Sequence, residues 1–175
     1  IKKGKIATVY QDLALDDLKN CWENIFLGRE ITRGKVFLDK NKMRKNTLEL
    51  LSRLGINIPD IDVPAGSLSG GQRQALAIAR AIDMDCSIVI FDEPTSAMGM
   101  RETYKTMELF RNLKESGKTV ILISHNLFQV FDIADRVAVL ENGVFIDTFE
   151  TKDSSPEKLH AQIVGKEKEL ARHEN

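Results

Sequence analysis

The sequence contains only two cysteines, Cys21 and Cys86, and they lie far apart. Their spacing matches no metal-binding pattern. Two isolated thiols favour a reduced, cytoplasmic protein over a small secreted domain held together by disulfides. A chain of 175 residues is also long enough to bury a hydrophobic core without such cross-links.

Long apolar runs and an excess of either charge are also absent from the sequence. Apolar stretches such as 88–91 and 120–123 are short, whereas a membrane-spanning helix needs about 20 apolar residues. The net charge is −1, with 29% charged residues, so neither a nucleic-acid-binding surface nor an acidic tail is indicated. No apolar stretch of signal-peptide length follows the N-terminus. Because a strand-like run starts almost immediately, we expect the chain to begin within a domain.

Strand-like and helical segments alternate along most of the chain. The expected strands are 5–10, 87–91, 119–123, 136–140 and 144–149, and the expected helices are 21–27, 41–54, 69–83, 101–116, 126–134 and one that starts at Pro156. The strands 87–91 and 119–123 are almost wholly apolar, which is typical of a parallel sheet covered by helices on both faces. We therefore predict an α/β fold with a mainly parallel sheet flanked by helices.

The same patterns predict how the chain is divided. Residues 19–83 contain mostly helical patterns and are expected to form a helical subdomain. Residues 1–18 and 84–165 would form the α/β core. The last segment, 166–175, is rich in charge and is expected to be a solvated tail.

The segment 68–74, Leu-Ser-Gly-Gly-Gln-Arg-Gln, opens one of the expected helices. Gly70 and Gly71 allow the backbone to approach a bulky anion, and Ser69 adds a hydroxyl donor. The N–H groups and the positive dipole end of the helix would point at the same anion. A serine that merely caps an amphipathic helix would give a similar pattern without any ligand.

Two adjacent carboxylates, Asp92 and Glu93, follow the apolar strand 87–91. Ligands of open α/β sheets bind at the carboxyl ends of the strands. There Asp92 could hold Mg²⁺ through water, and Glu93 could orient or deprotonate an attacking water. A polar loop after a core strand is the alternative, but the glycine-rich helix shortly before this pair favours a functional site.

Two further polar residues follow strands. His125 comes after the strand 119–123 and could donate a hydrogen bond to a γ-phosphate, although a single histidine is more often structural. Gln11 follows the first strand, where a glutamine beside Mg²⁺ could position water. Alone, neither residue carries a functional assignment.

Together and in this order, these features resemble the ABC ATPase family, over residues 5–165. The resemblance implies that Gln11 is the Q-loop glutamine and that the segment 68–72 is the signature motif. It also implies that Asp92 is the Walker B aspartate, Glu93 the catalytic base and His125 the switch histidine. The expected fold is then a P-loop NTPase-like ABC ATPase domain with a helical signature subdomain, and the expected cofactors are ATP and Mg²⁺.

A narrower resemblance is to the ATP-binding subunits of ribose-, xylose- and fructose-type importers. It is visible in the following segments: 9–15, 23–30, 124–126, 129–131 and 134–136. Gly99 stands where the usual D-loop carries an aspartate, and this sugar-importer group often has glycine there too. The departure supports the narrower resemblance.

In such a transporter the protein would hydrolyse MgATP as one subunit of a dimer and drive sugar import. Asp92 and Gln11 would hold Mg²⁺. The ATP held by one subunit would be enclosed by four residues of the other: Ser69, Gly70, Gly71 and Gln72. The further partners would be transmembrane permease subunits and, indirectly, a sugar-binding protein, with no nucleic acid. The protein would lie in the cytoplasm, on the inner face of the cell membrane.

The sequence contains no G-x-x-x-x-G-K-[ST] phosphate-binding loop. The tripeptide Gly117-Lys118-Thr119 lacks the first glycine of this motif, because Asn112 stands in its place. It also lies between a helix and a strand, the reverse of a P-loop. In the family the P-loop precedes the Q-loop, so we expect it, together with the first strands of the sheet, before Ile1. The chain alone is therefore expected to be inactive in ATP hydrolysis.

Two other functions stay open. One is a catalytically inactive module that acts only by pairing with a complete ATPase subunit. The other is a non-transport ABC ATPase, although the short spacing between Gly71 and Asp92 leaves no room for the long coiled-coil insertion of the DNA-repair type. The sequence does not identify the sugar, nor does it say whether a second ATPase domain follows.

Overall fold

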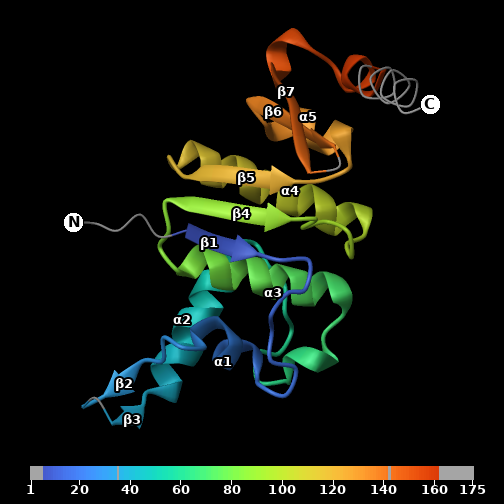
Figure 1. Ribbon diagram of the computed structural model, residues 1–175. Coiled ribbons are helices and arrows are strands. Elements are labelled where there is room, and N and C mark those ends of the chain that lie inside the picture. Colours follow the sequence, from blue (N-terminus) through green and yellow to red (C-terminus); the bar gives the residue numbers. More distant parts are fainter. Residues whose placement is uncertain (1–5, 35, 142, 162–175) are drawn as a thin grey trace. The chain divides into compact units, whose positions relative to one another are not determined.

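The computed structural model describes residues 6–34, 36–141 and 143–161, and it divides the chain into two compact units, 1–123 and 124–175. Unit 1 contains a parallel sheet, the helices that pack on it and a mostly helical segment (Figure 1). Unit 2 contains an antiparallel pair of strands and short helices. The predicted α/β class is confirmed.

The sheet of unit 1 has three parallel strands in the order β1-β4-β5. They are β1 (Ile6–Val9), β4 (Ile88–Asp92) and β5 (Thr119–Ile123). Val9 pairs with Phe91, and Phe91 with Leu122. Since all three strands run in the same direction, their carboxyl ends meet at one edge of the sheet.

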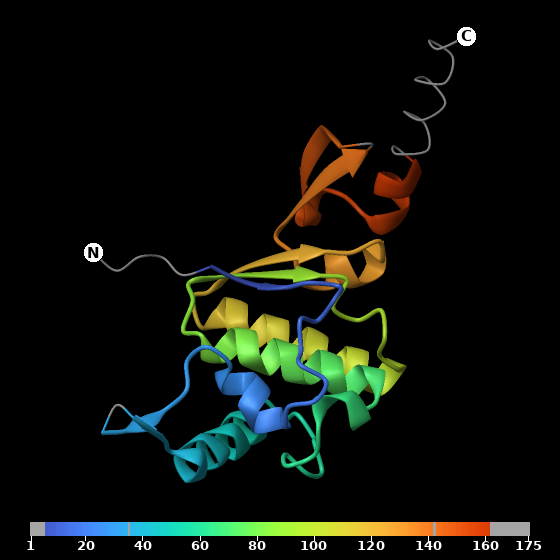
Figure 2. The ribbon, with the colours of Figure 1, turned by 60° about the horizontal axis from the view of Figure 1, so that its bottom comes forward.

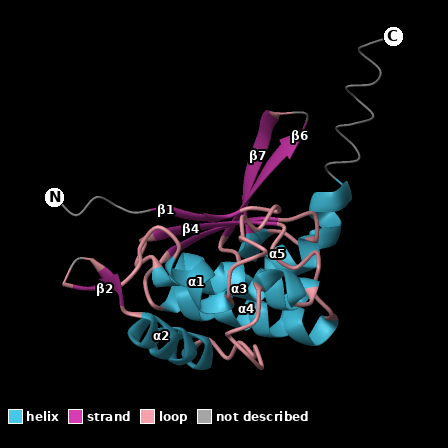
Figure 3. Ribbon diagram, turned by 90° about the horizontal axis from the view of Figure 1, so that it is seen from below, coloured by secondary structure: helices cyan, strands magenta, loops and turns pink. Residues whose placement is uncertain are grey.

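One face of this sheet packs against helices. Two helices, α3 (Gly70–Asp83) and α4 (Met100–Glu115), lie along it (Figures 2 and 3). Val89 and Phe91 of the central strand are fully buried. Phe91 stacks on Phe110 of α4 with 4.3 Å between the ring centroids, and this contact closes the core between the sheet and the helices.

The opposite face of the sheet is much more exposed. Ile6, Ile121 and Ile123 are 58%, 46% and 51% exposed, so the described residues leave this face largely uncovered at these positions. Alternate side chains of a strand point to opposite sides. The strands are therefore apolar on both faces, although in unit 1 α3 and α4 lie on one of them.

Between β1 and α3 the chain forms a further layer of helices. In this layer α1 (Cys21–Phe26) and α2 (Lys40–Arg53) pack against α3. A short 3-10 turn, η1 (Ala65–Ser67), leads into α3. The shared apolar cluster includes these buried side chains: Cys21, Ile25, Met43, Leu76 and Ala79. The expected helices at 21–27 and 41–54 are confirmed, and a separate subdomain over 19–83 stays a prediction.

This segment also contains a hairpin that the sequence analysis did not predict. Two strands, β2 (Thr32–Arg33) and β3 (Phe37–Leu38), pair in antiparallel fashion. Gly34 has a φ of +58°, a left-handed conformation that glycine adopts at little cost. Each strand is too short to show the alternating pattern by which strands are predicted.

Unit 2 starts with α5 (Leu127–Ile133) and continues into the antiparallel strands β6 (Arg136–Glu141) and β7 (Val144–Glu150). A 3-10 turn, η2 (Thr151–Asp153), precedes a helix that is described over 156–161. The predicted hairpin and the helix start at Pro156 are thus confirmed.

The expected charged tail, 166–175, lies outside the described residues. Within the described ranges, no helix combines the length and the apolar character that crossing a membrane requires.

Candidate functional site

Three of the predicted site residues lie at the carboxyl-terminal edge of the parallel sheet. Gln11 follows β1, Asp92 ends β4 and Glu93 comes directly after it. Because Val9 and Phe91 are paired, Gln11 and Glu93 leave adjacent strands at the same level. Gln11 is exposed, and Asp92 and Glu93 are half-buried. These side chains are therefore accessible where ligands of open α/β sheets bind.

Both the N–H and the carbonyl group of Glu93 form hydrogen bonds within the chain. Its N–H donates to the carbonyl oxygen of Ile123 at 3.0 Å. Its own carbonyl oxygen accepts from the Ser96 hydroxyl at 2.9 Å and from Gln74 Nε2 at 3.1 Å. The φ angle of Glu93 is +48°, a left-handed conformation that is rare outside glycine. Such strain often marks functional sites, and it persists only where the surroundings hold it.

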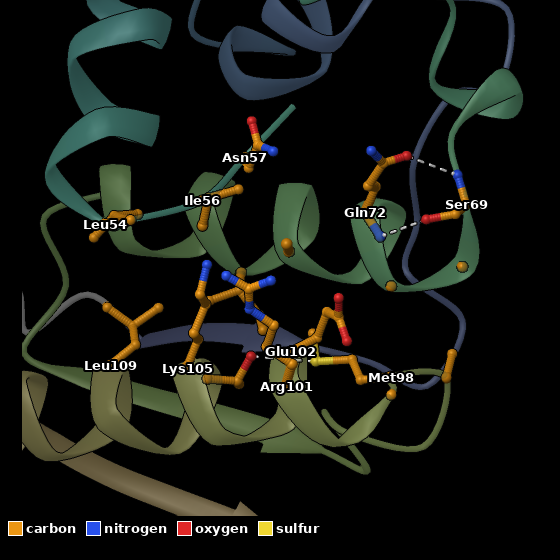
Figure 4. Close-up of a pocket in the computed structure, with 18 residues that line it drawn as sticks. Leu54, Ile56, Asn57, Ser69, Gln72, Met98, Arg101, Glu102, Lys105 and Leu109 are labelled. Atoms are coloured by element: carbon orange, nitrogen blue, oxygen red, sulfur yellow. Dashed lines mark hydrogen bonds between the residues drawn. The ribbon is translucent and has the colours of Figure 1, made fainter. Parts of the chain in front are cut away.

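The signature segment forms the N-terminus of α3 (Figure 4). The Gln72 N–H donates to Ser69 Oγ at 3.3 Å, and the Ser69 N–H donates to Gln72 Oε1 at 3.0 Å. This is a capping box. The cap leaves the N–H groups of Gly70 and Gly71 in the first turn, where helical N–H groups have no partner within the helix. The serine is thus a cap, and the helix end remains suited to an anion.

The two signature glycines are not needed for packing inside this chain. A Cβ atom added to Gly70 would lie 3.5 Å from the Ala97 Cβ, and one added to Gly71 would lie 3.7 Å from the Ala97 carbonyl oxygen. Both are ordinary contact distances. Neither glycine has a positive φ angle. A small residue here is therefore useful for close approach by a molecule from outside the chain.

A pocket of about 480 Å³ lies beside the signature, between α3 and α4. Arg101 and Lys105 of α4 point toward α3 across it, and Ile56 and Leu109 contribute apolar walls (Figure 4). Its lining includes the four signature residues Ser69, Gly70, Gly71 and Gln72. The pocket therefore borders the N-terminus of α3, where an anion would bind.

His125 lies in unit 2, just before α5. The next residue, Asn126, caps α5, because its side chain accepts from the Gln129 N–H at 3.2 Å. Asn126 in turn donates its N–H to the Ser124 hydroxyl at 3.1 Å. His125 is thus held in a capped helix entry, and it is not among the residues that unit 1 brings to the sheet edge.

The sheet edge offers oxygen donors of the kind that Mg²⁺ takes. Among the described residues there is no group of three or more His, Cys, Asp or Glu side chains that could enclose a metal ion. Mg²⁺ usually keeps several waters and takes one or two protein oxygens together with phosphate oxygens. Asp92 and Gln11 supply donors of that kind and number.

The sequence analysis did not identify the residues of α3 that bind the loops of this candidate site. Gln74 and Arg80 of α3 donate to backbone carbonyls of the loops after β4 and β1. Arg73 forms an ion pair with Asp17 at 2.6 Å. A polar residue on the apolar stripe of α3 could have indicated this role. Gln74 is such a residue, because it is buried and a buried amide requires hydrogen-bond partners.

Comparisons with known proteins agree with these observations. Residues 1–96 match the model of the ABC transporter family. The chain is 44% identical over 154 residues to the xylose/arabinose import ATP-binding protein XylG of Sulfolobus acidocaldarius, covering 88% of this chain and 61% of that protein. It is 39% identical over 171 residues to the fructose import ATP-binding protein FrcA of Rhizobium meliloti, covering 94% and 66%. It is 38% identical over 164 residues to a ribose import ATP-binding protein, RbsA, of Streptococcus agalactiae, covering 94% and 33%.

Solved structures of ATP-binding cassettes are similar as well. A dimeric cassette in a post-hydrolysis state, bound to ADP and Pi, superposes with a TM-score of 0.73 at 28% identity, covering 84% of this chain and 63% of that one. The chain spans between 33% and 66% of the length of the three relatives named above. The family match runs through the signature and the Asp92–Glu93 pair, and the chain therefore belongs to the ABC transporter family.

Proposed function

We propose that this chain is part of the ATP-binding and ATP-hydrolysing subunit of an ABC importer for a monosaccharide. The observation that carries the proposal is the end of α3, whose glycines serve no packing need within the chain and whose first-turn N–H groups suit a phosphate. It lies in the same unit as Gln11, Asp92 and Glu93. The relatives named as importers of xylose/arabinose, fructose and ribose support the sugar class.

In this proposal each site residue has a distinct role. Glu93 orients or deprotonates the attacking water, Gln11 helps to position it, and His125 donates to the γ-phosphate. Asp92 and Gln11 hold Mg²⁺, which when bound neutralises charge on the phosphate oxygens. Ser69, Gly70, Gly71 and Gln72 bind the phosphates of the ATP carried by a second subunit.

The proposed partners are a second ATPase subunit, transmembrane permease subunits and, through them, a sugar-binding protein. The dimeric state of the similar cassette supports the first. For the permease, the hairpin offers apolar contacts, because Val36 and Phe37 are each 75% exposed. We place the protein in the cytoplasm, at the inner face of the cell membrane.

Calorimetric titration with MgATP tests whether tight nucleotide binding requires a P-loop in addition to the residues of this chain. It compares this chain with a version extended upstream by a segment that carries the G-x-x-x-x-G-K-[ST] motif. Since the chain has no G-x-x-x-x-G-K-[ST] motif, only the extended version should bind MgATP tightly. Tight binding by the chain itself would contradict our account of the phosphate site.

The role of Glu93 is tested in the extended version by Glu93→Gln. This variant keeps the size and polarity of the side chain but removes its basicity. It should bind ATP as before and lose nearly all turnover, with a decrease of about 10²-fold or more expected for a general base. Glu115→Gln, at the exposed end of α4, is the matched control and should leave turnover unchanged. Near-normal turnover in Glu93→Gln would exclude Glu93 as the base.

The capped signature at the N-terminus of α3 also supports a second function, in which the chain acts only by pairing with a complete ATPase subunit. A pull-down with such a subunit, with and without ATP, tests it. Association that depends on ATP and on Ser69 supports pairing, and the lack of nucleotide-dependent association counts against it.

A further inference from the structure

One helix, α3, bonds to the backbone of both loops that carry the proposed site. Gln74 is 2% exposed, and its Nε2 donates to the carbonyl oxygen of Glu93 at 3.1 Å. Arg80, six residues further along α3, donates to the carbonyl oxygens of Ala14 and Leu13 at 2.7 and 3.0 Å. The first contact reaches the loop after β4, and the second reaches the loop after β1.

The acceptors of these bonds lie on strained backbone. Three residues other than glycine have a positive φ angle in the described part of the chain, and two of them are Ala14 at +50° and Glu93 at +48°. Both have their carbonyl oxygens bound by a side chain of α3. A left-handed conformation disfavours such residues and persists only where the surroundings hold it. The donors on α3 supply part of that restraint.

Each strained residue is close to a proposed catalytic group. Glu93 is itself the proposed base, and Gln11 lies three residues before Ala14. The direction in which a side chain leaves the sheet depends on the backbone angles at and beside it. A relaxation of Glu93 to ordinary angles would therefore redirect its carboxylate, and a relaxation at Ala14 would change the course of the loop that carries Gln11.

Both donors occupy places where an unpaired polar group would be costly. Gln74 lies among the buried residues of α3, such as Leu76 and Ile78. Burial lowers the pKa of the Arg80 guanidinium, and the nearby charge of Arg29 contributes to the same effect. Desolvated groups of this kind need hydrogen-bond partners, so the bonds to the two loops stabilise the donors as well as the acceptors.

We propose that Gln74 and Arg80 are positioning residues, which keep the loops after β4 and β1 in the left-handed conformation that directs Glu93 and Gln11 to the sheet edge. The effect on the backbone is independent of any activity. The effect on catalysis rests on the proposed function.

Amide hydrogen exchange on the 175-residue chain tests the backbone effect. Gln74→Met removes one donor and Arg80→Met the other, while an unbranched apolar side chain is kept at each position. In Gln74→Met the amides of Glu93 and Ser96, which donate to Ile123 and Glu93, should exchange about tenfold faster, as expected for the loss of one buried hydrogen bond.

The two variants act as controls for each other. In Arg80→Met the amide of Asp16, which donates to Asn24 Oδ1 at 2.8 Å, should exchange about tenfold faster, and the amide of Ser96 should not. Ile78→Val removes a buried methylene from the same helix and should affect neither loop selectively. Exchange that rises equally in all three variants, or in none, would overturn the proposal. If a methionine variant does not fold, Gln74→Asn shortens the first donor and Arg80→Lys replaces the second by a single ammonium group. Exchange of the same amides is then measured.

Kinetics of the version extended by a P-loop test the catalytic effect. Gln74→Met should lower kcat about tenfold or more and leave the Kd of MgATP unchanged, since it contacts no proposed ligand group. An unchanged kcat, with faster exchange at Ser96, would overturn the catalytic part of the proposal and leave the backbone part intact. If instead the extended version neither binds nor hydrolyses MgATP, the proposed function fails, and the exchange experiment still decides the role of Gln74 and Arg80.

Discussion

A positive φ angle is found both beside the proposed site and away from it. Besides Ala14 and Glu93, Asp85 also has a positive φ angle, +47°. It is exposed and directly follows Met84, the C-cap of α3. Helices commonly end with a left-handed residue at this position, and glycine is preferred there. The positive φ angle of Asp85 is thus a feature of the end of a helix.

Asp85→Gly should therefore stabilise the fold. Removal of the left-handed strain outweighs the larger entropy of glycine in the unfolded chain, so the free energy of unfolding should rise by about 0.5–1 kcal/mol. Equilibrium urea unfolding measures the change. Asp85→Ala is the matched variant and should lower the stability instead, because alanine has the Cβ atom without the local hydrogen bonding of aspartate. The same sign for both variants would contradict this explanation.

At the level of elements, the start of α2 depends on a single carboxylate. Asp39 is 9% exposed; it accepts from the Lys42 N–H at 3.1 Å and from Arg33 Nε at 2.7 Å. The hydrogen bond from Arg33, followed by that from the Lys42 N–H, lowers the pKa of Asp39. This carboxylate links the hairpin to the helix that follows it.

The lowered pKa predicts an acid-sensitive contribution to stability. A group with a depressed pKa in the folded state stabilises the fold above its unfolded pKa, and this contribution is lost as the pH falls through the folded value. The wild type should therefore exceed Asp39→Asn in stability at pH 7, and the difference should shrink as the pH falls below about 4. Urea unfolding from pH 7 to pH 3 measures it, with Lys45→Gln on the exposed side of α2 as a control. A difference that is independent of pH would exclude the charge of Asp39 as the cause.

The elements predictable from the sequence were those with a long periodic pattern. The apolar strands at 88–92 and 119–123 and the amphipathic α3 and α4 are confirmed at nearly the predicted bounds. The hairpin at 32–38 was missed because its strands have two residues each, so its pairing depends on a glycine turn and on packing rather than on periodicity.

The site could be predicted only in part. Motif order located Gln11, the signature and the Asp92–Glu93 pair, because each follows or begins a recognisable element. The roles of Gln74 and Arg80 were not visible. Their acceptors lie 19 and 66 or 67 residues away in the sequence, and only the folded backbone brings them within hydrogen-bond distance.

For the whole molecule, the exposed face of the sheet has consequences for association. Ile121 and Ile123 of β5 are about half exposed, and adjoining apolar surface of this kind often mediates contacts between molecules. The sequence predicted burial on both faces because it shows how apolar a strand is, and not which of its faces finds a partner.

We expect this chain to self-associate through that face at high concentration. The double variant Ile121→Thr/Ile123→Thr keeps β-branched side chains suited to a strand and should reduce the associated fraction in sedimentation velocity experiments. Its free energy of unfolding should change by no more than about 0.5 kcal/mol per exposed position. By contrast, Val89→Thr, at a buried position of β4, should destabilise the fold strongly. Undiminished association of the double variant would show that another surface is responsible.

The pairing of β1 with β4 also affects how fast the chain reaches its structure. Ile6 pairs with Ile88, so the segment that carries α1, α2 and α3 forms one closed loop of roughly 80 residues between the two strands, and closing it costs conformational entropy. Contacts among those helices span shorter stretches of chain and can form sooner. The helical layer would therefore form first and β1 would pair late, which leaves the edge of β4 open to other strands in the meantime.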